Sequence, residues 1–111
     1  MSKTTLGLEE NVEGALCYLL GVMTGIVFLV LEKESDFVKF HAMQSLVTFL
    51  SLIIIMIIVV ITIPFVGIII GLLINLVGFV FWAVGMYKAY QGERYKFPVF
   101  GDIAESLLKK I

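Results

Sequence analysis

Residues 40–87 read FHAMQSLVTFLSLIIIMIIVVITIPFVGIIIGLLINLVGFVFWAVGMY, and none of these 48 residues is Asp, Glu, Lys or Arg. The hydrocarbon core of a bilayer is about 30 Å thick and takes about 20 apolar residues as a helix. One helix of this length would reach roughly 72 Å. The stretch therefore predicts two membrane spans that fold back on each other.

The fold-back point is predicted at Pro64, within Ile63-Pro64-Phe65-Val66-Gly67. Proline removes a backbone donor and disfavours a helical conformation at the residue before it. Gly67 permits a tight turn. We expect a second span at about 40–63, a turn at 64–67 and a third span at about 65–87.

A further apolar stretch, about 12–31, precedes a charged loop at 32–39. We predict it as the first span, so that the fold class is an all-α integral membrane protein with three transmembrane helices. Ser35 or Asp36 is expected to cap the next helix. In the alternative, residues 21–25 break the first stretch, which then folds back without crossing.

Composition separates this chain from soluble classes. Of 111 residues, 60% are hydrophobic and 15% are charged, against roughly 45–50% and 25% in ordinary globular chains. This excess argues against a soluble enzyme, a nucleic-acid binder or a disordered tail. With one cysteine and one histidine, no structural zinc site is expected. No catalytic, cofactor or phosphate-binding motif is present, so we expect a non-enzymatic protein without a cofactor.

The basic residues predict an orientation in the cell membrane. With three spans, the loop 32–39 and the tail 88–111 share one side and carry seven Lys and Arg, whereas the other side carries Lys3 alone. Cytoplasmic segments are enriched in Lys and Arg. We therefore predict the N-terminus outside and the C-terminus in the cytoplasm. In the tail, Asp102 and Glu105 resemble a capping box that starts a short amphipathic helix.

Small and polar residues follow stripes on the predicted spans. Within lipid, small residues let helices approach closely, and these positions are candidates for packing inside the chain or for a homo-oligomer interface. They are Gly14, Gly21, Gly25, Gly67, Gly71, Asn75, Gly78 and Gly85.

A polar face on the second span is the main candidate site. It is confined to the half nearest the charged loop and consists of His41, Gln44, Ser45, Thr48 and Ser51. Polar groups at membrane depth need partners or water. The face is either a packing interface or a groove for a polar or peptide substrate. Glu13 is an acid near the membrane edge, where the helix dipole favours it. One alternative function is a small oligomeric channel or a proton-coupled transporter that uses this acid, and another is a packing or stability factor with no substrate.

Residues 31–45, with the string Phe40-His41-Ala42-Met43-Gln44-Ser45, resemble a family of small prokaryotic membrane proteins grouped with the 20-kDa subunit of the chloroplast inner-envelope preprotein translocon. Residues 7–11, 18–21, 88–95 and 101–104 fit the same pattern. The resemblance implies an integral membrane protein without known enzyme activity that works with membrane-protein partners in translocation or assembly. The chain lacks a transit peptide and has three predicted spans where the plant subunit has four, so organelle import is not implied.

Overall fold

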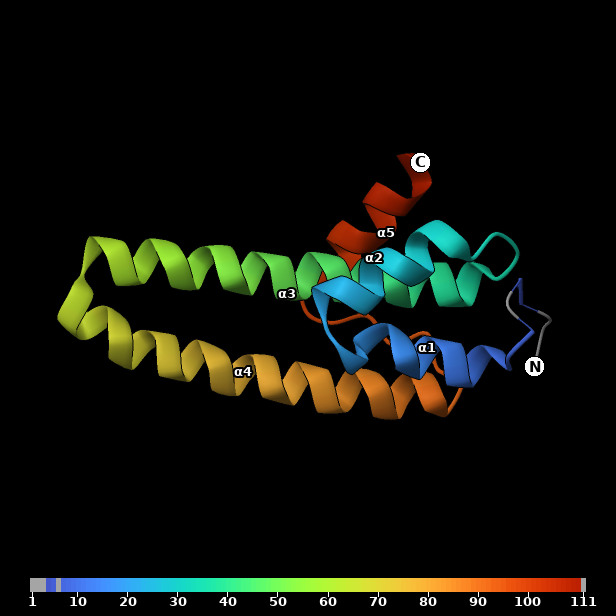
Figure 1. Ribbon diagram of the computed structural model, residues 1–111, viewed down its shortest axis with the longest axis horizontal. Helices are drawn as coiled ribbons and strands as arrows, with labels where there is room; N and C mark the ends of the chain where they lie inside the picture. The colour runs from blue at the N-terminus through green and yellow to red at the C-terminus, as the bar shows by residue number, and fades with distance from the viewer. Residues whose placement is uncertain (1–3, 6, 111) are drawn as a thin grey trace.

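The computed structural model describes residues 4–5 and 7–110 and, in that part of the chain, consists of helices without strands (Figure 1). The all-α prediction is confirmed. The helices are α1 (Glu10–Leu19), α2 (Val22–Leu31), α3 (Asp36–Thr62), α4 (Pro64–Tyr90) and α5 (Phe100–Lys110).

The long helices α3 and α4 form an antiparallel hairpin (Figure 1). Each has 27 residues and is therefore about 40 Å long, enough to cross a hydrocarbon core of about 30 Å. In the described chain these two helices are long and apolar enough to span a membrane. Ser35 caps α3 as predicted, because its hydroxyl oxygen accepts a hydrogen bond from the Val38 N–H at 3.2 Å.

The turn between the two long helices is shorter than predicted. Ile63 alone separates them, and residues 64–67, expected as the turn, form the first turn of α4. Proline suits this first position because its missing N–H would have no partner there. Gly67 serves close packing instead, since a Cβ at this residue would lie 2.5 Å from the carbonyl oxygen of Val59.

The predicted first span, about 12–31, is wrong as one crossing helix. It is divided into α1 and α2, each of 10 residues and so about 15 Å long, half the hydrocarbon thickness. The break lies at Gly21, whose φ of 62° and ψ of −120° suit a residue without a Cβ. In Figure 1, α1 lies beside α4 and runs from the N-terminal end toward the middle of the long hairpin, and α2 lies beside α3 and runs back toward the same end. The alternative of a fold-back at this glycine describes the observed arrangement.

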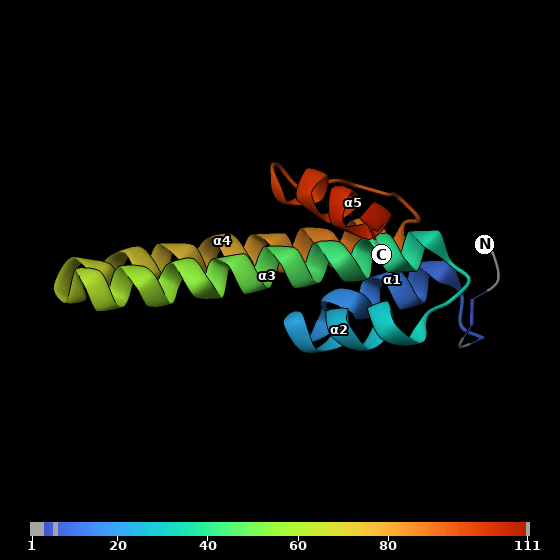
Figure 2. The same ribbon diagram turned by 90° about the horizontal axis from the view of Figure 1, so that it is seen from above.

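The C-terminal tail also forms a fold-back. After α4, residues 93–97 run along α3 toward the middle of the molecule. Helix α5 then reverses direction toward the end that holds the charged loop 32–39, called the charged end below (Figure 2). Figure 2 places α5 on one side of the α3–α4 pair and the α1–α2 hairpin on the other. The predicted C-terminal helix is present, but it begins at Phe100, so Asp102 lies inside its first turn and not at the cap.

The two halves of the molecule differ in thickness. Each buried residue of α3 lies between Val38 and Thr48, and none lies between Phe49 and Thr62. Near the turn, Ile61 is 74% and Phe65 83% exposed. One half thus contains α1, α2 and α5 around the spans, whereas the other half consists of α3 and α4 alone (Figures 1 and 2).

The N-terminal segment lies at the same end as the charged loop. The backbone N–H of Thr5 donates to both Glu32 carboxylate oxygens, at 3.0 and 3.2 Å. At this end the tail residue Arg94 also pairs with Asp36, at 2.7 Å. In the structure the described N-terminal segment, the loop and the tail thus lie at one end, whereas three crossing helices would place the N-terminal segment at the other.

Candidate functional site

A buried hydrogen-bond network joins α1, α3 and the tail. The hydroxyl of Tyr18 lies 2.7 Å from Nδ1 of His41, and Nε2 of His41 lies 2.9 Å from the carbonyl oxygen of Glu93. A carbonyl only accepts, so Nε2 carries the proton and Nδ1 accepts from the tyrosine. Gln44 Nε2 in turn donates to the Tyr18 hydroxyl at 2.8 Å. All three side chains are fully buried.

The same glutamine holds the non-helical tail. Its Nε2 also donates to the carbonyl oxygen of Tyr95 at 2.9 Å, and its Oε1 accepts from the N–H of Phe97 at 2.8 Å. Non-helical backbone at membrane depth persists only where its polar groups find partners. His41 and Gln44 therefore supply the hydrogen bonds that allow residues 93–97 to lie against α3.

A second set of polar side chains forms hydrogen bonds with the backbone groups at the break between α1 and α2. The indole N–H of Trp82 donates to the carbonyl oxygen of Leu19 at 3.1 Å, and the Ser45 hydroxyl donates to that of Gly21 at 3.1 Å. The hydroxyl of Thr24 bonds to further backbone groups at the break. These contacts replace helical hydrogen bonds lost where the chain turns.

The predicted polar face is thus divided between two tasks. His41 and Gln44 bind the tail, and Ser45 binds the α1–α2 break. Thr48 is fully buried, and its hydroxyl has no hydrogen-bond partner among the described residues. Ser51 is half-buried beyond the network. His41, Gln44 and Ser45 therefore make contacts within the chain. Their polar groups bind non-helical backbone at two places, the tail and the α1–α2 break.

The predicted small residues lie at close contacts between helices of this chain. A Cβ at Gly85 would lie 2.8 Å from the Tyr18 ring, and one at Gly25 would lie 3.0 Å from the Ala42 carbonyl oxygen. Gly14, Gly21, Gly67, Gly71 and Gly78 each face another segment as well. Asn75 donates to the Gly71 carbonyl oxygen at 3.0 Å and lies 3.4 Å from Met56 Sδ.

Two of the buried glutamates at the charged end, Glu13 and Glu32, have shifted pKa values. Burial would raise the pKa of Glu32, but the backbone N–H donors of Ser35 and Thr5 outweigh it and hold the pKa at about 2. Burial raises the pKa of Glu13, against a hydrogen bond from Thr4, and the neighbouring Glu32 raises it further. Of the two groups, Glu13 therefore retains its proton to higher pH than Glu32. It lies in the first turn of α1, outside the two spans.

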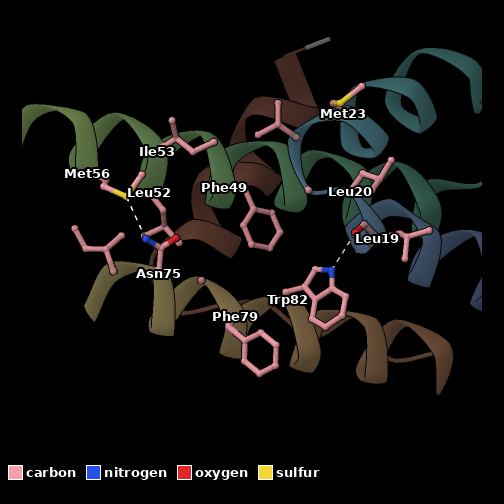
Figure 3. Close-up of a pocket in the computed structure, with 14 residues that line it drawn as sticks. Leu19, Leu20, Met23, Phe49, Leu52, Ile53, Met56, Asn75, Phe79 and Trp82 are labelled. Atoms are coloured by element: carbon pink, nitrogen blue, oxygen red, sulfur yellow. Dashed lines mark hydrogen bonds between the residues drawn. The ribbon is translucent and has the colours of Figure 1, made fainter. Parts of the chain in front are cut away.

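An apolar groove of about 490 Å³ lies where the tip of the α1–α2 hairpin meets the spans (Figure 3). Figure 3 shows Phe49 and Trp82 beside this tip and Asn75 directed toward Met56. Its lining is almost entirely apolar, as expected of a surface at hydrocarbon depth. No group of three or more His, Cys, Asp or Glu side chains in the described ranges is arranged to hold a metal ion.

Two side chains of these polar contacts are not among the predicted site residues. They are Tyr18 in the buried network and Thr24 at the α1–α2 break. A tyrosine and a threonine in a predicted apolar span carry little signal alone. Their relevance depends on α1 lying beside α3 and on the chain turning at Gly21, neither of which the predicted first span specifies.

The fold and these contacts define a small helical membrane protein, with two long apolar helices and shorter segments packed on one half of them. A family model described as the magnetosome magnetite crystal formation protein family matches residues 9–104. The chain belongs to this family.

Named relatives agree with membrane location. A UPF0132 membrane protein of Methanocaldococcus jannaschii is 59% identical over 105 residues, covering 95% of this chain and 94% of the relative. A UPF0132 membrane protein of Archaeoglobus fulgidus is 53% identical over 98 residues, covering 88% and 94%. No solved structure matches.

These matches correct the family resemblance drawn from residues 31–45. The chain belongs with the magnetosome-associated family model and the archaeal membrane proteins, and not with the chloroplast translocon subunit. Within the string at residues 40–45, His41 and Gln44 hold the tail, a structural use that identifies no activity. The translocation role implied by the resemblance has no support.

Proposed function

We propose that this protein is a non-enzymatic structural component of the membrane that favours curvature, because it occupies one leaflet more than the other. The observation that supports this is the unequal thickness of its halves. Three short helices surround the spans in the charged half, and α3 and α4 stand alone in the other half (Figure 2). A wedge of this shape fits best where the leaflet around its wider half is expanded.

The orientation belongs to the same proposal. Seven basic residues lie at the charged end, and the turn at Ile63–Pro64 has none. Because cytoplasmic segments are enriched in Lys and Arg, the wide half would lie in the cytoplasmic leaflet. The protein would then favour membranes that are convex toward the cytoplasm.

A transporter centred on Glu13 is a weaker candidate. The Thr4 hydroxyl lies 2.5 Å from a Glu13 carboxylate oxygen, and Glu32 is its other neighbour. This carboxyl group lies at the charged end, so a relay through the two-helix half would have to form without another acid, since residues 40–87 contain none. Binding to partner proteins and self-association remain predictions, and a wedge-shaped protein is compatible with either.

The proposal is tested with the whole chain in giant vesicles from which thin membrane tubes are pulled outward. Vesicles are sorted into two preparations by whether a C-terminal tag is accessible from outside. The charged end faces outward in one preparation and inward in the other. The expected result is enrichment on the tube with the charged end outside and depletion with it inside. Equal density on tube and flat membrane in both preparations would overturn the proposal.

A further inference from the structure

A groove of about 290 Å³ opens at the charged end between the last turn of α2 and the end of α5. Both helices contact α3, but they do not contact each other within the described residues. The first turn of α3 therefore lies at the base of the gap. Its apolar lining consists of Leu29, Val30 and Leu108, and its charged lining of Glu32, Lys33, Asp36 and Lys39.

The two acids of this groove are engaged within the chain. The Glu32 carboxylate accepts hydrogen bonds from the backbone of Thr5, Glu34 and Ser35. Asp36 pairs with Arg94 at 2.7 Å. Both acids line the groove, and both have partners within the chain.

The two lysines differ from the three basic residues at positions 88–96. Lys88, Arg94 and Lys96 each form an ion pair, whereas Lys33 and Lys39 form none with the described residues. Lys39 is half-buried and Lys33 is exposed. The groove thus combines two lysines that form no ion pair, two acids that bind other groups of the chain, and an apolar wall. It lies at the boundary where the uncharged part of α3 begins.

We propose that this groove binds the phosphate headgroup of an anionic phospholipid, with Lys33 and Lys39 on the phosphate and the apolar residues along the first part of an acyl chain. Basic pockets between helices near the membrane surface recognise such headgroups. Ammonium groups bind phosphate oxygens through charge-assisted hydrogen bonds. The inference depends on the charged end lying at the membrane surface and not on membrane bending.

The test measures lipid retained by the purified full chain in native mass spectrometry, after reconstitution in phosphatidylcholine with or without phosphatidylglycerol. The double variant Lys33→Gln/Lys39→Gln removes two charges from the groove. The matched double variant Lys109→Gln/Lys110→Gln removes two charges from the same end but outside the groove. Lys33→Arg/Lys39→Arg keeps the charge, and thermal unfolding in phosphatidylcholine alone checks folding.

Retention of one phosphatidylglycerol is expected in the wild type and in the arginine variant. The loss expected for the groove variant is roughly 10- to 30-fold, and for the matched variant less than about threefold. Equal loss in both glutamine variants would overturn the proposal, because it indicates diffuse attraction. Equal retention of phosphatidylcholine, or full competition by inorganic phosphate, would also overturn it. Neither outcome affects the curvature measurement.

Discussion

The Tyr18 hydroxyl lies 2.7 Å from Nδ1 of His41 and connects α1 to α3 across 23 positions of sequence. This contact fixes the tautomer of the histidine, because its other nitrogen faces a carbonyl oxygen. It also leaves the tyrosine oxygen free to accept from Gln44. One buried network therefore joins the N-terminal helical hairpin, the first span and the C-terminal tail.

Gln44→Leu should destabilise the fold strongly. Leucine leaves the buried N–H of Phe97 and carbonyl oxygen of Tyr95 without their partner, at about 1–3 kcal/mol for each group. We expect a loss of roughly 3 kcal/mol in unfolding free energy and faster amide exchange at Phe97. Ser51→Ala, on the same helix and beyond the network, should change stability by less than about 0.5 kcal/mol. Similar unfolding curves for the two variants in detergent would contradict this role.

Gly85→Ala should loosen the packing of α1 against α4. The new Cβ would lie 2.8 Å from the Tyr18 ring and 3.0 Å from Phe97 Cζ, and neither ring moves freely because both are buried. The expected cost is about 1–3 kcal/mol, as for other overpacked cores. Gly78→Ala is the matched control, since its Cβ would meet Leu52 at an ordinary 3.5 Å. Thermal unfolding of both variants distinguishes a local clash from a general effect on α4.

Much of the hairpin was predictable from sequence, because an uncharged run of 48 residues must cross a bilayer twice and Pro64 interrupts it. The polar face was also found, since Gln44 and its neighbours stand out among apolar residues. Their partners were not found. Residues 12–31 are long and apolar enough for a span, and only the backbone angles of Gly21 divide them. The tail lies against α3 through backbone groups, which leave no pattern of side chains to detect.

Gly21→Ala should destabilise the break between α1 and α2 for conformational reasons alone. Glycine adopts its φ of 62° freely, and a Cβ there would have ordinary space, 3.6 Å from the Phe49 ring. A residue with a Cβ held in this sparsely populated backbone region is strained by about 1–3 kcal/mol. Leu20→Ala, which changes an exposed side chain beside it, should cost much less. Chemical denaturation in detergent compares them, and equal midpoints would show that the glycine conformation carries no strain.

Acid should release the N-terminal segment through Glu32. Its pKa of about 2 lies below the usual 4.5, so its stabilising effect is present above pH 4.5 and is lost as pH falls from there toward 2. Amide exchange of residues 4–9 should therefore rise over this interval. Glu32→Gln should weaken this pH dependence, and Glu34→Gln, in the same loop and exposed, should preserve it. An unchanged pH profile in Glu32→Gln would contradict the assignment.

Glu13 should act in the opposite direction. Its raised pKa means that its contribution to stability is present below the usual value and is lost as pH rises through the folded-state value. Glu13→Gln should therefore reduce the loss of stability on the alkaline side. It should move the acid transition of Glu32 only slightly, because the backbone donors of Ser35 and Thr5 lower the pKa of Glu32 more than Glu13 does. Unfolding curves between pH 3 and 8 separate these two contributions, and a shared change in both would indicate one coupled transition.

Both ends of the chain should lie on one side of the membrane. The contact of Thr5 with Glu32 and that of Arg94 with Asp36 bring the N-terminal segment, loop and tail to the same end, and the Ile63–Pro64 turn lies at the other. Phe65→Cys, at a position 83% exposed, should react with an impermeant maleimide in intact cells. Leu8→Cys and Lys110→Cys should react only after permeabilisation. The native Cys17 is fully buried, so the unmodified chain gives the background. A three-span chain would instead label Leu8→Cys together with Phe65→Cys, because an odd number of crossings separates the N-terminal segment from the tail.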